Sequence, residues 1–516
     1  MEILFVSPTS CTVLTDPEGD YQARKKHLLR LDGEEIGEEY RSVCSLFDLE
    51  PDTEYTLESR TEDGETETVT FRTKAETCCL NARDFGAKGD GIADDTPMIQ
   101  AAILCCPAGG RVLIPPGDYV TGPLFLKSRM TLEIAGGATL KLETDRKRFP
   151  VLPGDVPADN PEGEILMGLW EGEAADDFAS ALTGIEVTDT AVIGEGVIDG
   201  RSQESDWWIR PRDRRIAWRG DLLYLQRCRN MTFQGLTFRN SPAWTLHPAF
   251  SEGLDFLDLR IEAPWDSPNT DGFDPESCRG VRLIGTEISV GDDCIAVKSG
   301  KIDIGKKYRR PCEDVEIAWC AMLDGHGGVT LGSEMAGGIR KIRVHHCYMR
   351  GNDRGLRIKT RRGRGKDGVI DDILFEKVRM DGVKMPLIVN SMYFCDADGK
   401  SEWVQSREKK PVDETTPRIG RVRFELVKAT GCRACAGYVL GLPEQPVEEV
   451  ALKDCEFTFD PEAEPLIPVM ATQIEECLRR GLILRNVRKV TMESVQAEGF
   501  EGPWTETENV EEIIQK

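Results

Sequence analysis

The fold is decided by a five-residue pattern that reads Arg229-Asn230-Met231-Thr232-Phe233 and returns as Glu252-Gly253-Leu254-Asp255-Phe256 and Arg279-Gly280-Val281-Arg282-Leu283. In each copy, polar residues are followed by an apolar, a polar and another apolar residue. Further copies begin at Glu313, Arg340, Asp371, Gly420 and Glu448. Copies in the central part lie 23 to 34 residues apart, which is the length expected when each repeat is one coil of several short strands.

The residue types in these repeats distinguish between two kinds of solenoid. Leucine-rich repeats have similar periods, but their regular leucine and asparagine positions are missing here, and the strands are rich in Val, Ile and Phe. We therefore predict an all-β fold, a right-handed parallel β-helix. A solenoid needs covered ends, and the stretch 97–104 predicts a short helix at the first one. The preceding Asp94 and Asp95 are predicted to cap that helix.

The first 75 or so residues have a different pattern. Alternating runs at 53–58 and 67–72, with a turn at 62–65, predict antiparallel strands. The stretch from Leu49 to Tyr55 resembles the corner of fibronectin type III modules, where a tyrosine ties a strand to the preceding turn. We predict a fibronectin type III-like β-sandwich at 1–76 and the β-helix at 77–516, with a linker around 74–80.

Charge and cysteine content restrict the partners and the compartment. A net charge of -25 and a pI near 4.8 disfavour nucleic-acid and anionic-membrane partners. An acid at position 2 and a short apolar run argue against a signal peptide. The 17 scattered cysteines predict reduced, buried thiols, and the pair Cys432 and Cys435 lacks further ligands at zinc spacing. We expect a cytoplasmic protein without metal or cofactor.

Four polar clusters recur at spacings close to one coil: Asn269-Thr270-Asp271, Gly291-Asp292-Asp293, Gly325-His326-Gly327 and Arg357-Ile358-Lys359. Because strands in adjacent coils lie about 4.7 to 4.9 Å apart, we expect these clusters to line one cleft. Neighbouring residues of a regular strand face opposite sides. Asp292 and Asp293 can both reach a substrate only if the backbone bends, for which Gly291 is suited.

These residue types indicate acid/base chemistry on an anionic substrate. One reaction that such residues could carry out is hydrolysis of a glycosidic bond, which needs one protonated carboxyl group for the leaving oxygen and one carboxylate that activates water or attacks carbon. Clustered acids repel one another, which raises the pKa of at least one of them. In addition, the segment 354–366 carries seven Arg or Lys residues and no acid. A cationic patch in an acidic chain predicts capture of a polyanion.

Together, the four clusters resemble the signature motifs of glycoside hydrolase family 28, the polygalacturonases, and 84–91, 240–248 and 295–300 are also similar to family segments. The resemblance covers about residues 80 to 400. It implies a pectin lyase-like β-helix that hydrolyses α-1,4 bonds between galacturonate units with inversion. It further implies that Asp292 is the general acid, that Asp271 and Asp293 position and deprotonate water, and that His326 hydrogen-bonds within this cluster. Arg357 and Lys359 would bind the galacturonate carboxylate, with Asn269 and Lys298 as further substrate contacts.

The expected compartment indicates the mode of action. Polymeric pectin does not enter a cytoplasm, so we expect exo-action on imported oligogalacturonides. The loop with Trp207, Trp208 and the basic stretch 210–219 is predicted to close one end of the cleft. Three alternatives stay open: a rhamnogalacturonan or xylogalacturonan hydrolase, a calcium-dependent pectate lyase on the same fold, and a non-catalytic carbohydrate-binding β-helix. The presence of the clustered acids argues against a non-catalytic β-helix. The sequence leaves the oligomeric state, the choice between exo and endo action and the role of the N-terminal domain open.

Overall fold

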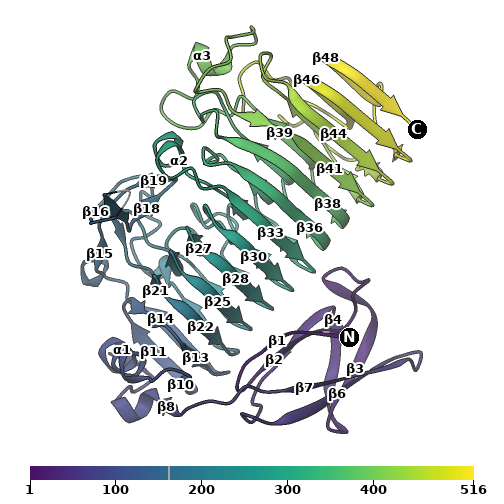
Figure 1. The fold of residues 1–516 in the computed structure, drawn as a ribbon. Helices are drawn as coiled ribbons and strands as arrows, with labels where there is room; N and C mark the ends of the chain where they lie inside the picture. Colours follow the sequence, from purple (N-terminus) through teal and green to yellow (C-terminus); the bar gives the residue numbers. More distant parts are fainter. Residues whose placement is uncertain (161–162) are drawn as a thin grey trace.

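The computed structural model describes residues 1–160 and 163–516 and shows a long parallel β-helix with a small antiparallel domain against its side (Figure 1). The first strand of the helix is β8 (Cys79–Asn81) and the last is β48 (Thr505–Gln515). The main sheet contains 31 strands. The predicted parallel β-helix is thus confirmed. None of the helices in the described ranges is long and apolar enough to span a membrane.

Each coil contributes strands to three parallel stacks. One coil consists of β30 (Arg279–Ile284), β31 (Glu287–Ser289) and β32 (Asp293–Val297), and the next of β33 (Cys312–Ala318), β34 (Ala321–Leu323) and β35 (Gly327–Leu331). Corresponding strands pair in parallel, β30 with β33, β31 with β34 and β32 with β35. The first stack therefore contains the five-residue repeats of the sequence, and the third contains the polar clusters.

The core of the third stack is a column of aliphatic side chains. Ile295, Val329, Leu356 and Leu387 lie one above another on β32, β35, β37 (Arg354–Lys359) and β39 (Met385–Asn390), and all are fully buried. Each such side chain contributes about 1.5 to 3 kcal/mol by leaving water. Because the apolar partners fix the register of these strands, they also fix which polar residues become neighbours.

A short helix covers the N-terminal end of the solenoid. Helix α1 (Thr96–Cys105) lies where the sequence predicts it and buries Ile99 and Ile103. The capping contacts differ from the prediction. The Asp95 carboxylate makes no cap hydrogen bond and instead accepts from the backbone N–H groups of Lys88 and Gly89. The acid at position 95 therefore fixes the loop that precedes the helix.

The N-terminal domain consists of two antiparallel sheets. One contains β1 (Glu2–Val6), β2 (Cys11–Leu14) and β5 (Val43–Leu46), and the other contains β3 (Gln22–Leu31), β4 (Glu34–Arg41), β6 (Glu54–Thr61) and β7 (Thr66–Arg72). The Tyr55 hydroxyl accepts a hydrogen bond of 2.9 Å from the Glu50 N–H. This contact ties β6 to the turn before it, while the fibronectin type III likeness stays a prediction.

The small domain docks on the first stack of the solenoid. Leu14 and Val43 pack against Leu257, Ile284 and Ala318. Polar contacts flank this apolar patch. The Ser10 hydroxyl donates to Gln234 and the Arg41 guanidinium donates to Asp258, each with a donor–acceptor distance of 2.5 Å. These contacts involve strands of the first stack, and they leave the third stack to other segments.

Candidate active site

The three predicted acids converge at the third stack. Asp271 lies just before the segment 273–276, Asp292 precedes β32, and Asp293 is its first residue. One carboxylate oxygen from each lies within 4.8 Å of the others. Arg357 and Lys359 reach the same point from β37. The structure therefore brings together residues from clusters that are 21 to 88 positions apart in the chain.

Asp293 is a fixed anion. It is fully buried and accepts hydrogen bonds from Arg357 Nη1 at 3.1 Å and from Lys359 Nζ at 2.8 Å. Burial opposes its charge, but Lys359 and Arg357 outweigh burial and lower the pKa of Asp293 far below its usual range. A Cβ atom at Gly327 would lie 2.6 Å from Asp293 Oδ1. Glycine at position 327 thus leaves room for this carboxylate.

Asp271 has the opposite environment. It is only 4% exposed, and burial, followed by the charge of Asp292, raises the pKa of Asp271 well above its ordinary value. Asp271 and Asp293 therefore differ in basicity although they share one site.

Asp292 and His326 form the solvent-facing side of the cluster. The His326 side chain is 54% exposed, its Nδ1 lies 3.9 Å from Asp292 Oδ1, and its backbone N–H donates to the Asp292 carbonyl. Asp292 and Asp293 both reach the site because Asp292 lies outside strand β32. The chain bends at Gly291 and Asp292, as predicted, and a Cβ at position 291 would lie 2.4 Å from the carbonyl oxygen of Ser267.

Lys298 lies behind Asp271. Its Nζ is 3.4 Å from Glu334, 3.5 Å from Asp274 and 4.0 Å from Asp271, and the residue is 4% exposed. Burial opposes the charge of Lys298, but Glu334, Asp274 and Asp271 outweigh it and raise the pKa of the amine. The structure thus gives Lys298 three carboxylate partners from the protein itself, beneath the surface that a substrate would contact.

Asn269 is bound by the loop that precedes the repeats. Its side-chain oxygen accepts a hydrogen bond of 2.7 Å from Arg219, whose guanidinium also donates to the carbonyls of Pro242 and Pro268. Arg219 is buried. The basic stretch 210–219 therefore positions one of the predicted substrate contacts.

Two further polar side chains of the site have no signal in the repeats. Tyr393 places its ring 5.7 Å from the Arg357 guanidinium and 5.5 Å from Lys359 Nζ. Glu334 is buried, but Lys298 and Arg364 outweigh this effect and lower its pKa to about 2. Both residues follow strands of the third stack: Tyr393 lies three positions after Asn390, the end of β39, and Glu334 lies three positions after Leu331, the end of β35. A search of the segments after these strands would have found them.

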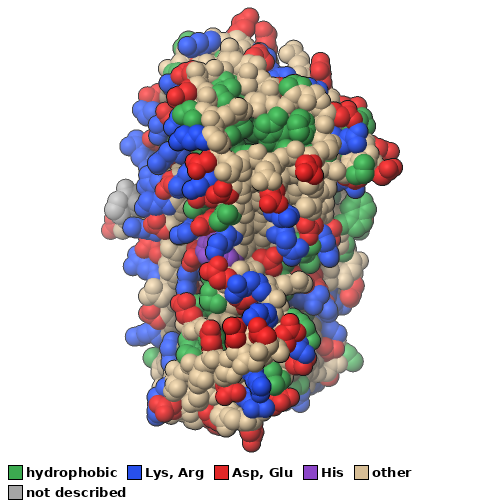
Figure 2. Space-filling model, turned by 90° about the vertical axis from the view of Figure 1, so that its right-hand side faces the viewer, with side chains coloured by type: hydrophobic (Ala, Val, Ile, Leu, Met, Phe, Trp, Pro, Cys, Tyr) green, Lys and Arg blue, Asp and Glu red, His purple; other side chains and the backbone are tan. Residues whose placement is uncertain are grey.

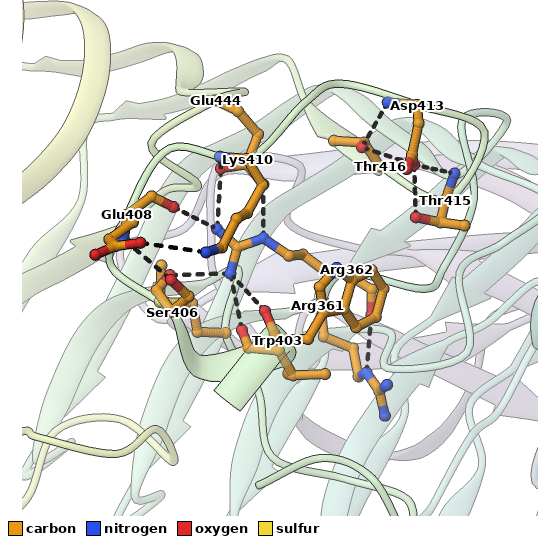
Figure 3. Close-up of polar contacts among 12 residues, drawn as sticks. Arg361, Arg362, Trp403, Ser406, Glu408, Lys410, Asp413, Thr415, Thr416 and Glu444 are labelled. Atoms are coloured by element: carbon orange, nitrogen blue, oxygen red, sulfur yellow. Dashed lines mark hydrogen bonds and ion pairs between the residues drawn. The ribbon is translucent and has the colours of Figure 1, made fainter. Parts of the chain in front are cut away.

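Three further arginines of the predicted cationic patch are used inside the protein. Arg362 donates to both oxygens of Glu444, at 2.6 and 2.9 Å, and to the carbonyls of Trp403, Val404 and Ser406 (Figure 3). Both charged side chains are buried. Arg361 pairs with Asp398 at 2.6 Å, and Arg364 pairs with Asp396 at 3.0 Å. These arginines fix the long loop after β39.

A large cavity of about 1430 Å³ adjoins these loops. Its walls come from the hairpin of β18 (Leu169–Trp170) and β19 (Glu173–Ala174), from helix α2 (Ile302–Tyr308) and from the loop before α3 (Glu402–Gln405). Trp218 also lines it and stacks on Trp170 with 4.8 Å between ring centres. Of the loop predicted to close the cleft, Arg212 and Trp218 line this cavity, whereas Trp207 is buried in the core.

Comparisons with known proteins agree with the geometry. The model of the family "Glycosyl hydrolases family 28" matches residues 111–464. A "Probable polygalacturonase" of Vitis vinifera is 32% identical over 323 residues, which span 61% of this chain and 63% of the grape protein.

Two solved structures are similar over most of the chain. An exopolygalacturonase of Thermotoga maritima has 25% identity and a TM-score of 0.64, covering 81% of this chain and 91% of that one. The family 28 exopolygalacturonase of Yersinia enterocolitica has 18% identity and a TM-score of 0.71, covering 100% and 97%; at that identity the likeness concerns the fold. With the family model matched over most of the solenoid and the acids and cations of the site in one place, the chain belongs to glycosyl hydrolase family 28.

Proposed function

We propose that the protein hydrolyses α-1,4 bonds between galacturonate units of pectic oligosaccharides and releases sugars from a chain end. The observation that carries this proposal is the fixed anion Asp293, bonded to Arg357 and Lys359, beside the pair of Asp271 and Asp292. Family membership supports hydrolysis, and relatives named polygalacturonase support the substrate. The Thermotoga relative is named an exopolygalacturonase, which supports exo-action.

The three acids can divide the chemistry among them. Asp292, half-buried and next to His326, donates its proton to the glycosidic oxygen as the bond between that oxygen and the anomeric carbon breaks. A water molecule bonds to the anomeric carbon, and its proton passes to the ionised form of Asp271. Asp293 stays ionised and stabilises the positive charge that develops at the sugar. The remaining N–H groups of Arg357 and Lys359 bind the substrate carboxylate.

A calcium-dependent elimination is a distinct candidate chemistry on the same fold. The three acids are close enough together to contact one cation. However, both oxygens of Asp293 already accept hydrogen bonds from Arg357 and Lys359, and these cations would repel a metal ion at the same place. This arrangement favours hydrolysis.

The compartment proposal rests on the thiols. All 17 cysteines lie in the described part of the chain and all are free. Free thiols persist in reducing compartments. We propose that the enzyme works in the cytoplasm on imported oligogalacturonides, and measuring its activity in fractionated cells would test this.

Incubation with trigalacturonate and with polygalacturonate, each with and without a chelator, tests the proposal. Release of galacturonate monomer that is insensitive to chelator is expected. Unsaturated products, detected by their absorbance, would overturn hydrolysis, and mid-sized fragments from the polymer would overturn exo-action. Asp292→Asn should lower kcat by about 10²- to 10⁴-fold, the usual contribution of a general acid, with unchanged far-UV circular dichroism. Asp454→Asn, at an exposed acid outside the cavity, is the control.

A further inference from the structure

The tip of the β18–β19 hairpin contains a glutamate in a conformation that suits another residue. Leu169 pairs with Ala174 and Trp170 with Glu173, so Glu171 and Gly172 form a two-residue turn. Their φ values are +46° and +74°, as in a type I′ turn. Asn or Gly is strongly preferred at the first position of such a turn. Turn chemistry therefore does not explain the glutamate at position 171.

The hairpin tip packs against residues that lie behind the catalytic cluster. The Gly172 carbonyl accepts a hydrogen bond of 2.9 Å from the Lys301 N–H, and a Cβ at Gly172 would lie 2.8 Å from Glu334 Cγ. Glu334 pairs with Lys298, which lies 4.0 Å from Asp271. The tip is thus separated from Asp271 by two side chains.

The strand before the tip contacts the opposite side of the site. The Arg219 guanidinium lies 5.4 Å from the centre of the Trp170 ring, and the same guanidinium donates to Asn269. Glu171 is therefore placed between the residues that support Asn269 and those that support Asp271, and it lines the cavity of about 1430 Å³.

The carboxylate of Glu171 differs from three others in the cavity wall. Glu173, Asp396 and Asp398, which line the same cavity, are each paired with a cation. Glu171 makes no hydrogen bond or ion pair with any residue that the structure describes. It is half-buried, and burial together with Glu334 raises its pKa. A hydrogen-bond donor from a ligand would satisfy this acid.

The end of a galacturonate chain offers such a donor. In an interior unit, the oxygen on carbon 4 is part of a glycosidic bond and carries no hydrogen. At the non-reducing end that oxygen is a free hydroxyl group, next to the hydroxyl on carbon 3. A carboxylate only accepts hydrogen bonds, so it distinguishes the chain end from the interior. We propose that Glu171 binds the free carbon-4 hydroxyl of the non-reducing galacturonate and selects chain ends, an inference that rests on the proposed function.

Paired substrates and paired variants test this assignment. The substrates are trigalacturonate and a trimer whose terminal unit is 4-deoxy and 4,5-unsaturated, which lacks the carbon-4 hydroxyl. The variants are Glu171→Asn and the control Glu186→Asn. Glu186 is exposed and has a φ of +54°, so asparagine suits both backbones. Fold is checked by Tm, which both substitutions should leave unchanged or raise.

Glu171→Asn is expected to lower kcat/KM on trigalacturonate about tenfold or more, as for the loss of a hydrogen bond to a charged group. On the unsaturated trimer, the wild type should already be slow. The kcat/KM of the variant should differ from that of the wild type by less than about twofold, because no contact is lost with this substrate. Glu186→Asn should change neither rate. Equal losses on both substrates, or none on trigalacturonate, would refute the role of Glu171. A wild-type protein inactive on both trimers would instead refute the proposed function, and the inference with it.

Discussion

At the scale of single residues, the site separates two neighbouring acids by their partners. Asp293 has two cations within hydrogen-bond distance, whereas Asp271 has burial and Asp292 acting against its charge and Lys298 at 4.0 Å. Environments that push the pKa values of neighbouring carboxyl groups apart are a common basis of acid and base catalysis. The pKa of Asp293 is depressed, so its contribution to stability is present above the unfolded value of about 3.9. That contribution is lost as the pH falls through the folded value.

Replacing one of these cations should make the protein sensitive to acid. In Lys359→Met, Asp293 keeps only Arg357, so its folded pKa rises and acid unfolding begins at a higher pH. At pH 7 the free energy of unfolding should fall by about 3 kcal/mol, the low end for a broken buried pair. Urea unfolding at pH 7 and pH 4.5 measures both effects. Lys366→Met removes an exposed pair with Glu414 and should change neither; equal acid sensitivity in both variants would contradict the argument.

The stereochemistry of the reaction is a second consequence at this scale. The carboxylate oxygens lie within 4.8 Å of one another, closer than the roughly 6.5 to 9.5 Å usual for inverting enzymes. Nevertheless, Asp293 has both oxygens engaged and Asp271 is almost fully buried, so neither is free to attack carbon. We predict that water attacks and that the first product is the β anomer. Proton NMR during the first minutes of hydrolysis shows the anomer, and an initial α anomer would contradict the prediction.

At the scale of elements, strands and loops differ in how far the sequence predicts them. Asp271, Asp293 and Arg357 follow the coil spacing, and the structure places them together because apolar columns fix the register of the third stack. Lys298 follows the same spacing, yet its depth below the surface depends on Glu334, which lies in a loop. Glu171 and Tyr393 also come from segments outside the repeat. Their positions depend on contacts distant in sequence, such as Trp170 on Trp218, and no local pattern specifies such contacts.

The buried pair of Arg362 and Glu444 should decide whether the loop after β39 keeps its place. In Glu444→Gln, Arg362 stays buried without its anion, which costs about 3 to 5 kcal/mol. The expected result is local: the loop opens and the half-buried Arg407 and Lys410 become more accessible to trypsin, with little change in the solenoid. Limited proteolysis and mass spectrometry measure this. Glu408→Gln, whose side chain is 85% exposed, is the matched control, and equal cleavage of both variants would contradict an anchoring role for the pair.

At the scale of the whole molecule, docking and catalysis occupy different faces. The small domain packs on the first stack, and the acids lie on the third. The net charge of the chain is -25. On the long face shown in Figure 2, acidic and basic side chains are interspersed. Because the two regions lie on different faces, we expect that substitutions in the domain interface leave the active site unchanged.

Val43→Asp tests this separation. A charge introduced among Leu14, Leu257 and Ile284 should lower the free energy of unfolding by about 3 kcal/mol, at the upper end of the usual range, and detach the small domain. Hydrogen exchange should rise in the strands beneath it, while kcat/KM at low temperature stays that of wild type. Ile36→Asp, at an exposed position of the same domain, should have no effect. A loss of activity in Val43→Asp with the fold intact would show that the domain supports the site.

The stacking of coils has a consequence for how the protein loses its structure. In a solenoid each coil contacts only its neighbours, so unravelling can begin at one end and stop anywhere along the axis. The side chains of the site come from four successive coils, those of Asp271, Asp292, His326 and Arg357. A bound sugar chain that contacts all four links these neighbouring coils in the middle of the solenoid. Substrate binding then makes these four coils unfold as one cooperative unit, and the substrate-bound enzyme resists fraying more than the free enzyme does.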